Sequence, residues 1–291
     1  MTTFEANIIN IYAEQGKAWL ADIPKKVNEI AVKWGLSDLQ PMNNLSYNYV
    51  LSGFQNAQPI ILKLGINVKE LNAEAVALKS FGGFGAVKIL IQREGALLLE
   101  RAIPGDLLKS YFPNRDHDAI QITCEVMKKL HQAPLTSSHT YPHVRDWLTA
   151  LDKNWDIPAG YLEKARHLRD QLLITAPTEV LLHGDLHHEN ILRQGEQFVI
   201  IDPKGVIGEP AYEIPAFIRN PIPKLLDNDQ ASKIISTRIS DFSDILGIDR
   251  KRIEDWCFVQ AVLSWLWSLE EGTDPSYFNR LTIILDETQA V

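Results

Sequence analysis

Short apolar runs separated by turn residues characterise the chain from about residue 47 to residue 100. The β-prone runs cover residues 47–51, 60–64, 87–91 and 96–100, and turn signals lie between them at Gly53, Pro59, Gly85 and 93–95. Between the second and third runs, residues 69–81 place Leu71, Ala75 and Leu78 on one helical face. This pattern predicts a small antiparallel sheet with one inserted helix.

Helical periodicity dominates the chain on both sides of this region. Residues 1–40 repeat apolar positions at helical spacing, punctuated by Pro24 and Gly35. Further helices are expected at residues 116–132, 249–271 and 275–287, and a β-rich interruption is expected at 180–182, 191–193 and 198–201. The turn at residues 194–196 predicts that the last two of these strands form a hairpin.

The order of these elements predicts an α+β fold with two lobes. The N-terminal lobe would cover residues 1–103, with leading helices at about 1–40, and the mainly helical C-terminal lobe would cover residues 104–291. A connector near residues 100–105 would join the lobes. Ligands commonly bind where two such units meet, so we expect a binding cleft at the connector.

The composition is that of an ordinary folded protein, with 291 residues, 45% of them hydrophobic and 23% charged. A formal net charge of −8 argues against a nucleic-acid partner and is compatible with a cationic one. Cys124 and Cys257 form no Cys-x-x-Cys pair, which argues against a disulfide framework or a cysteine zinc site and favours a reducing compartment. The first residues lack signal-peptide features and no apolar run reaches the ~18 residues of a membrane span, so we expect a cytoplasmic protein without a membrane partner.

The densest cluster of polar and charged residues lies at 183–190, where the chain reads His-Gly-Asp-Leu-His-His-Glu-Asn. Three of the eight histidines fall in this segment, which follows an apolar run. Asp202 stands at the end of a later apolar run. Loop tips that rigid strands hold in place are where catalytic residues tend to lie, so we expect the chemistry of the protein here.

This spacing supplies what a phosphoryl transferase needs. Such an enzyme requires a carboxylate that accepts the proton of the attacking hydroxyl, oxygen ligands for Mg²⁺, and a cation on the α- and β-phosphates. Asp185 would be the base, and Asn190 and Asp202 would be the metal ligands. The cation would be Lys63, in the second β-prone run, where a buried ammonium needs a partner. Glu74, on the inserted helix, would be that partner.

A resemblance to known kinases rests on the same residues. The motif His-Gly-Asp-(x)4-Asn, followed by Ile-Asp, resembles the aminoglycoside phosphotransferase and choline-kinase branch of the protein-kinase-like fold. The longer string over 181–213, with Asp-Pro-Lys-Gly at 202–205 and Arg-Asn-Pro at 219–221, is similar to the streptomycin 6-kinase and hydroxyurea phosphotransferase subfamily. Further matching pieces are 62–64, 74–78, 97–105 and the tryptophan-rich segment 256–267. The resemblance covers about residues 40–270.

The resemblance implies the same role for each of the five residues above, with ATP and Mg²⁺ as cofactors. It also implies that the backbone of Glu100 and Ala102 holds adenine. The nucleotide loop at residues 43–48, Asn-Asn-Leu-Ser-Tyr-Asn, lacks the glycines of protein kinases. Ser46 and nearby amides are therefore expected to contact the phosphates.

The implied reaction is transfer of the γ-phosphate of ATP to a hydroxyl of a cationic, aminoglycoside-like small molecule. Within the subfamily the leading acceptor is streptomycin at its 6-hydroxyl, and the activity would confer antibiotic resistance. Carboxylates that bind the acceptor are expected in the helical lobe. The candidates are Glu254, Asp255, Glu270 and Glu271. The resemblance further implies that Glu209 and Glu213 brace the catalytic loops, while no role follows for Lys204.

Three other interpretations stay open at this point. The acceptor could be another small metabolite, such as an amino sugar or a choline-like alcohol. The histidines of the 183–190 segment, together with Asp185, could instead bind zinc in a metallohydrolase, because zinc sites need this density of nitrogen and carboxylate donors. That reading leaves Lys63, Glu74 and Asn190 unexplained. The third interpretation is a nucleotide-binding module that does not catalyse, which the complete set of catalytic residue types disfavours.

Overall fold

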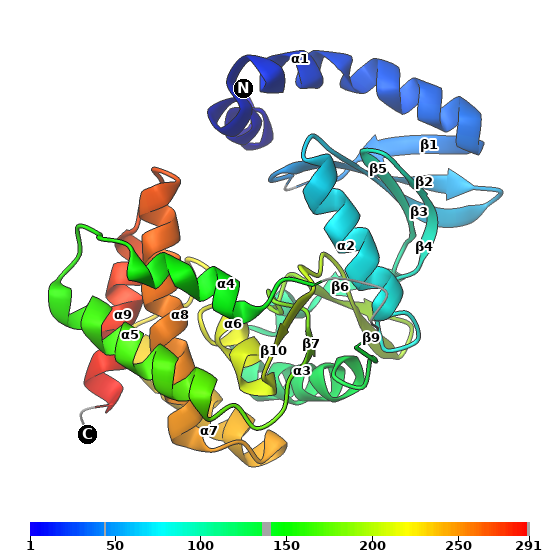
Figure 1. Ribbon diagram of the computed structural model, residues 1–291. Helices are drawn as coiled ribbons and strands as arrows, with labels where there is room; N and C mark the ends of the chain where they lie inside the picture. Colours follow the sequence, from blue (N-terminus) through cyan, green and yellow to red (C-terminus); the bar gives the residue numbers. More distant parts are fainter. Residues whose placement is uncertain (44, 136–140, 290–291) are drawn as a thin grey trace.

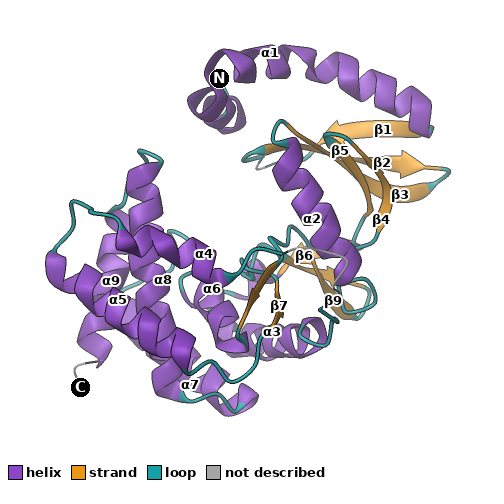
Figure 2. Ribbon diagram, viewed as in Figure 1, coloured by secondary structure: helices purple, strands orange, loops and turns teal. Residues whose placement is uncertain are grey.

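The computed structural model describes residues 1–43, 45–135 and 141–289. In Figure 1 the chain forms a sheet-containing N-terminal lobe, covered by a long first helix, and a larger C-terminal lobe. Figure 2 shows that helices make up most of the second lobe, with short strands between them. The expected α+β fold with two lobes is confirmed. The boundary after residue 103 stays a prediction.

A five-stranded antiparallel sheet forms the N-terminal lobe, in the order β1-β2-β3-β5-β4. Its strands are β1 (Leu36–Pro41), β2 (Asn48–Gln55), β3 (Gln58–Gly65), β4 (Ile89–Arg93) and β5 (Ala96–Glu100). The central strand β3 is the most deeply buried, with Ile60, Leu62 and Leu64 in the core. The four expected strands are confirmed. The edge strand β1 was not expected, because it is mostly exposed and lacks a regular alternation of apolar residues.

The first helix, α1 (Thr3–Trp34), differs from the interrupted helix that the sequence suggested. The helix runs through Pro24 and bends instead at Ala13, where φ is 47° and ψ is −124°. Its apolar face, including Trp19, packs into the same core as the sheet, and this packing outweighs the hydrogen bond that a proline removes. Gly35 ends the helix in the left-handed conformation, as its position predicts.

Helix α2 (Val68–Ser80) packs on the sheet beside β4 and β5, and confirms the helix expected at 69–81. Its N-terminus is capped by the side chain of Asn67. Residues three and four positions apart share a helical face, so Glu74 lies on the same side as the buried Leu71 and Leu78. The apolar pattern of α2 therefore carries a carboxylate onto the face that packs against the sheet.

The C-terminal lobe is built on helices (Figure 1). They are α3 (Asp116–Leu130), α4 (Val144–Leu148), α5 (Ala159–Ile174), α6 (Ile214–Ile218), α7 (Ala231–Leu246), α8 (Arg250–Glu270) and α9 (Ser276–Gln289), with 3-10 turns at Leu108–Tyr111, Thr149–Asp152 and Pro210–Glu213. The expected helices are confirmed as α3, α8 and α9. Helix α8 is buried along most of its length and forms the centre of the lobe. In the described part of the chain, no helix is long and apolar enough to span a bilayer.

Two small sheets lie where the lobes meet. One has the order β6-β8-β9 and the other pairs β10 with β7. Their strands are β6 (Pro104–Leu107), β7 (Val180–Leu182), β8 (Ile191–Gln194), β9 (Gln197–Ile200) and β10 (Val206–Gly208). The expected hairpin is present as β8 and β9. The N–H of Val87 donates to the carbonyl of Ile200 at 3.1 Å, and the N–H of Ile200 donates to the carbonyl of Gly85 at 2.8 Å, so β9 is bonded directly to the N-terminal lobe.

Candidate active site

Lys63 lies in β3 with its side chain buried between two carboxylates. Its ammonium donates to Glu74 Oε2 at 2.7 Å and to Asp202 Oδ1 at 2.9 Å. Glu74 comes from α2, whereas Asp202 follows β9 in the other lobe. The predicted ion pair between Lys63 and Glu74 is therefore present, and the lysine also joins the N-terminal lobe to the loop that carries Asp202.

The surroundings of Lys63 keep it charged. Burial alone would lower the pKa of Lys63, but Asp202 and Glu74 outweigh this effect and raise it. Burial raises the pKa of Glu74 to about 7, although Lys63 acts in the opposite direction. Its second oxygen, Oε1, is buried without a hydrogen-bond partner among the described residues. Burial would also raise the pKa of Asp202, but Lys63 dominates and lowers it. A permanent cation thus stands beside Asp202, which suits an anionic phosphate ligand.

The loop that follows β7 is held in place by the buried carboxylate of Glu213. This carboxylate accepts the N–H of His183 at 2.7 Å and the N–H of Gly184 at 2.9 Å. The ring of His183 accepts the N–H of Asp185 at 3.2 Å and donates from Nε2 to the carbonyl of Ile201 at 2.8 Å, a tautomer assigned from these partners. Glu213 therefore braces the catalytic loop, as expected.

Two features of this loop require a glycine at position 184. Its φ of +83° lies in the left-handed region, which side chains disfavour. A Cβ at this position would also lie 2.9 Å from Trp147 Cη2 and 3.0 Å from Val206 Cγ1. The indole of Trp147, on α4, therefore contacts the backbone immediately before Asp185.

Asp185 presents its carboxylate between two cationic or potentially cationic side chains. Its Oδ1 accepts from Arg219 Nη2 at 3.2 Å, and its Oδ2 lies 3.5 Å from His187 Nε2. Burial alone would raise the pKa of Asp185, but His187 and Arg219 outweigh it and lower the pKa. The carboxylate is therefore ionised near neutral pH. It can accept a hydrogen bond from a hydroxyl and orient it for attack.

Asn190 and Asp202 lie at the same end of the β8–β9 hairpin. The N–H of Ile201 donates to the carbonyl of Asn190 at 3.1 Å. Asn190 Nδ2 donates to the carbonyl of Asp185 at 2.9 Å, which leaves Oδ1 of the amide as an available oxygen ligand. A carboxamide oxygen and a carboxylate are donors that Mg²⁺ prefers, so these two residues fit a magnesium site.

Three further residues, Ser46, Glu100 and Ala102, were predicted to bind the nucleotide. Ser46 precedes β2 in the loop that also contains Asn44, and Asn44 lies outside the described residues. Glu100 ends β5, and its side chain accepts the N–H of Lys88 at 2.9 Å. Ala102 is buried where the chain leaves the sheet. Both the carboxylate and the N–H of Glu100 are engaged, since the N–H donates to the carbonyl of Lys88 at 2.9 Å. The roles of Ser46, Glu100 and Ala102 stay predictions.

The histidines of the catalytic loop do not converge on a common point. His188 is buried and stacks on Phe217 with ring centroids 3.9 Å apart, whereas His183 contacts the backbone and His187 faces Asp185. Among the residues that the structure describes, no group of three or more His, Cys, Asp or Glu side chains is arranged to hold a metal ion. The zinc metallohydrolase interpretation therefore loses its proposed ligand cluster.

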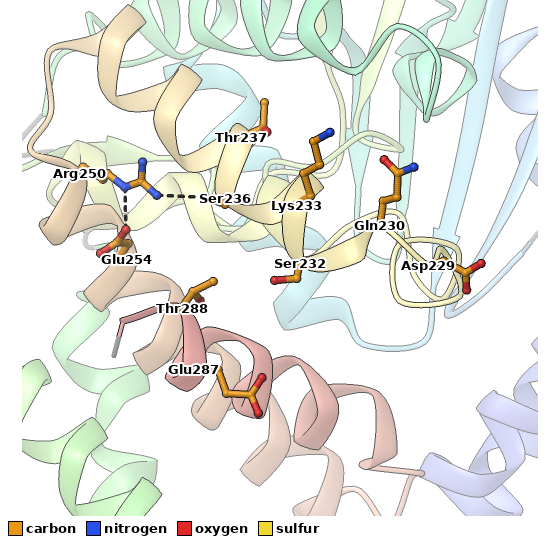
Figure 3. Close-up of a pocket in the computed structure, with 10 residues that line it drawn as sticks. All are labelled: Asp229, Gln230, Ser232, Lys233, Ser236, Thr237, Arg250, Glu254, Glu287 and Thr288. Carbon is orange, nitrogen blue, oxygen red and sulfur yellow. Dashed lines mark hydrogen bonds and ion pairs between the residues drawn. The ribbon is translucent and has the colours of Figure 1, made fainter. Parts of the chain in front are cut away.

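A polar cavity of about 980 Å³ lies away from these residues, between α7, the first turn of α8 and the end of α9 (Figure 3). Its lining is Asp229, Gln230, Ser232, Lys233, Ser236, Thr237, Arg250, Glu254, Glu287 and Thr288. Glu254 was a candidate acceptor ligand, but its carboxylate accepts from Arg250 Nε at 2.8 Å within this cavity. The volume of a cavity therefore does not identify the candidate active site in this protein. The buried charged residues identify it instead.

The other expected brace, Glu209, does not reach the catalytic loop. Its carboxylate accepts two hydrogen bonds from Arg252, each at 2.6 Å, and one from Trp256 Nε1 at 2.5 Å. Both partners lie on α8, so Glu209 joins the turn after β10 to the central helix. The expectation that it braces the catalytic loop was wrong, because the extra reach of a glutamate side chain is used toward α8.

Sequence reasoning gave no role to Arg219, although this residue contacts the carboxylate of the predicted base. The only available signal was its place in the Arg-Asn-Pro string that closes the matching segment. Gln260 was missed as well. Its Oε1 accepts from Arg219 Nη1 at 2.8 Å, and nothing in the apolar pattern of α8 marks it.

Together, a five-stranded lobe with a buried lysine and a helical lobe that carries Asp185, Asn190 and Asp202 define an ATP-dependent phosphotransferase with the protein-kinase-like fold. Comparison with known proteins narrows this class. The chain belongs to the aminoglycoside/hydroxyurea antibiotic resistance kinase family, whose model matches residues 33–272.

Individual relatives agree with this assignment. A streptomycin 3''-kinase of Klebsiella pneumoniae is 30% identical over 77% of this chain and 85% of its own length. A streptomycin 6-kinase of Streptomyces griseus is 24% identical over 89% of this chain and 87% of its own length. The fold is shared with a thermostable mutant of the aminoglycoside phosphotransferase APH(4)-Ia, solved with AMP-PNP and hygromycin B. The TM-score is 0.67 at 17% identity, over 91% of this chain and 99% of the other.

Proposed function

We propose that this enzyme transfers the γ-phosphate of ATP to the 6-hydroxyl of streptomycin and thereby confers resistance to it. The observation that carries the proposal is the contact of Lys63 with both Glu74 and Asp202, beside a loop that presents Asp185 and Asn190. The choice of streptomycin is supported by both relatives named as streptomycin kinases, and the choice of its 6-hydroxyl by the streptomycin 6-kinase.

The proposed reaction is an in-line transfer. The oxygen of the acceptor hydroxyl bonds to the γ-phosphorus as the bond to the β–γ bridging oxygen breaks, the hydroxyl proton passes to Asp185, and ADP leaves. Lys63 neutralises charge on the α- and β-phosphates. The backbone of Glu100 and Ala102 holds adenine, and Ser46 contacts the phosphates.

Asn190 Oδ1 and the carboxylate of Asp202 would hold Mg²⁺, which neutralises phosphate charge when bound. Removal of divalent metal with a chelator is therefore expected to abolish ADP formation, and added Mg²⁺ to restore it in full. A coupled ADP assay on the purified enzyme measures both steps. Zn²⁺ serves as the matched control and should not restore activity. Full turnover in excess chelator would contradict the assignment of both ligands.

Aromatic and acidic side chains near the catalytic loop support a cationic acceptor. Trp147 contacts Gly184, and its ring centroid lies 6.4 Å from that of Trp267 on α8, in an edge-to-face arrangement. Both indoles are half-buried, and such faces attract cations. Glu271 caps the C-terminal end of α8, where the helix dipole adds negative charge.

The acidic candidates on α8 separate by helical face. Residue 271 is eleven positions after Gln260, which brings Glu271 to the same face as the residue that contacts Arg219, whereas Asp255 falls on nearly the opposite face. Burial raises the pKa of the Tyr47 hydroxyl, in the predicted nucleotide loop, and the charge of Glu271 raises it further. By contrast, Glu270 pairs with Lys153 at 2.7 Å. Of the four candidates, Glu271 is the one we place at the acceptor.

Glu271→Gln is expected to raise the KM for streptomycin about 10-fold while leaving the KM for ATP unchanged, because one charge-assisted contact to a guanidinium is lost. Steady-state kinetics with each substrate varied in turn gives both constants. Glu254→Gln is the matched control, since this carboxylate lies in the distant cavity of Figure 3. If both substitutions changed the KM for streptomycin equally, the assignment of Glu271 to the acceptor site would be wrong.

A screen of acceptors tests the proposed function directly. ADP release is measured with streptomycin, other aminoglycosides, hydroxyurea, choline and amino sugars at equal concentrations. The proposal predicts the highest kcat/KM with streptomycin and a raised growth-inhibitory concentration of streptomycin in cells that express the enzyme. Turnover with choline or hydroxyurea but not with streptomycin would show that the enzyme is a phosphotransferase and that the proposed acceptor is wrong.

A further inference from the structure

Arg219 is held on three sides and directs one N–H of its guanidinium at Asp185. Nη2 donates to Asp185 Oδ1 at 3.2 Å, and Nη1 donates to Gln260 Oε1 at 2.8 Å. Its backbone carbonyl accepts the hydroxyl of Tyr277 at 2.6 Å. Only 14% of its side chain is exposed. The guanidinium therefore has little freedom to move away from the carboxylate.

The partner of Arg219 is itself oriented. Gln260 Nε2 donates to the carbonyl of Tyr212 at 2.6 Å, so its Oε1 must face the opposite way, toward Arg219. Gln260 is buried in the middle of α8, where an amide is retained only if both of its polar ends are bonded. Helices α8 and α9 thus both contact Arg219 at the end of α6, α8 through its guanidinium and α9 through its backbone carbonyl.

We propose that Arg219 is a positioning residue for phosphoryl transfer: it fixes the plane of the Asp185 carboxylate by binding Oδ1, so that Oδ2 faces the acceptor hydroxyl. The terminal torsion of an aspartate is soft and nearly two-fold, so a lone carboxylate would rotate between several orientations. A guanidinium is planar, stays charged and offers donors in a rigid fork, and therefore fixes such a rotation better than an ammonium does. The proposal rests on the proposed function, because it assigns Asp185 the role of base.

A purely structural role explains the arrangement less well. The side chain of Asp185 is 31% exposed and that of Arg219 14%, so solvent partly screens this ion pair and its contribution to stability should be modest. By contrast, a small misplacement of a group that orients a reacting atom lowers turnover strongly. The buried amide of Gln260 that holds the Arg219 guanidinium therefore fits a role in orienting Asp185 better than a role in stability.

A double-mutant cycle tests the proposal. Arg219→Met is expected to lower kcat about 10- to 100-fold with no change in the KM for ATP. In the Asp185→Asn background the same substitution should cost nothing further, because its effect passes through the carboxylate. Gln260→Leu, which keeps the arginine, should lower kcat in the same direction by a smaller factor. It also keeps the test valid if Arg219→Met fails to fold.

The cycle is run on streptomycin phosphorylation and on the slow hydrolysis of ATP with water as acceptor. If the wild-type enzyme did not phosphorylate streptomycin, the proposed acceptor would be wrong. The double-mutant cycle measured on ATP hydrolysis would still test the role of Arg219. Restoration of turnover by added guanidinium ion in Arg219→Ala, but not in Asp185→Asn, would support the proposal. An equal loss from Arg219→Met in both backgrounds would overturn it, since Arg219 would then act independently of Asp185.

Discussion

Asp185→Asn is expected to lower kcat by about 10²- to 10⁴-fold, the usual contribution of a positioned general base. The amide has the shape of the carboxylate but cannot accept the proton of the acceptor hydroxyl. His187 and Arg219 lower the pKa of Asp185 against the effect of burial, so the carboxylate is ionised and able to accept a hydrogen bond from the hydroxyl. In the proposed mechanism other residues hold ATP, so binding of a non-hydrolysable ATP analogue, measured by calorimetry, should not change.

Glu189→Gln provides the matched control for this prediction. Glu189 lies in the same loop, but its carboxylate pairs with Lys109 at 2.7 Å and does not contact Asp185. We expect this variant to keep wild-type kcat. Full turnover by Asp185→Asn would show that another group accepts the proton, and an equal loss in both variants would show that the loop as a whole had been disturbed.

Arg238→Met is expected to lower the free energy of unfolding by about 3–5 kcal/mol, the usual cost of removing one partner from a buried ion pair. Arg238 is completely buried and binds both oxygens of Asp116 at 2.7 Å. Its Nη1 also donates to the carbonyls of Phe217, Ile218 and Asn220. The substitution therefore removes the arginine donor from a carboxylate and from three carbonyls where α3, α6 and α7 meet, and of these carbonyls that of Phe217 still accepts the N–H of Asn220 at 3.1 Å.

Urea unfolding followed by circular dichroism measures this loss. Arg115→Met is the control, because Arg115 is exposed and its pair with Asp118 joins neighbouring turns of one chain segment. We expect no measurable change in the urea concentration at which half of the Arg115→Met variant is unfolded. If Arg238→Met unfolded at the same urea concentration as the wild-type enzyme, the stabilising role assigned to Arg238 would be contradicted.

The stability contributed by Asp116 depends on pH. Burial would raise the pKa of Asp116, but His188 and Arg238 lower it to about 2. This stability is therefore present above about pH 4 and is lost as the pH falls toward 2.

Local patterns predicted the core of the site because its geometry follows from short-range periodicity. Apolar residues at helical spacing placed Glu74 on the inner face of α2, and the β-prone run around Lys63 placed that lysine in the sheet. The hairpin turn at 194–196 placed Asp202 near Asn190. In each case one secondary-structure element determines which way the side chain faces. The contact of Lys63 with Asp202 across the lobes was not predicted.

Other features could not be predicted, because they depend on packing between distant segments. Arg219 and Asp185 are 34 residues apart, on elements that no shared periodicity connects. Helix α8 is apolar almost all round, so its pattern does not show which face carries Glu271 and which carries Glu254. The course of α1 through Pro24 likewise depends on burial of Trp19 against the sheet, which outweighs the local preference of proline.

The most direct test of the central claim is the structure of the product formed from streptomycin. The enzyme is incubated with Mg²⁺, ATP and streptomycin, and the product is purified and analysed by mass spectrometry and by phosphorus–proton correlation in nuclear magnetic resonance. The account predicts streptomycin that carries one additional phosphoryl group on its 6-hydroxyl, formed in equal amount to ADP, and at least about 100-fold slower formation of this product with Asp185→Asn. Unmodified streptomycin after complete conversion of ATP to ADP and free phosphate would contradict it.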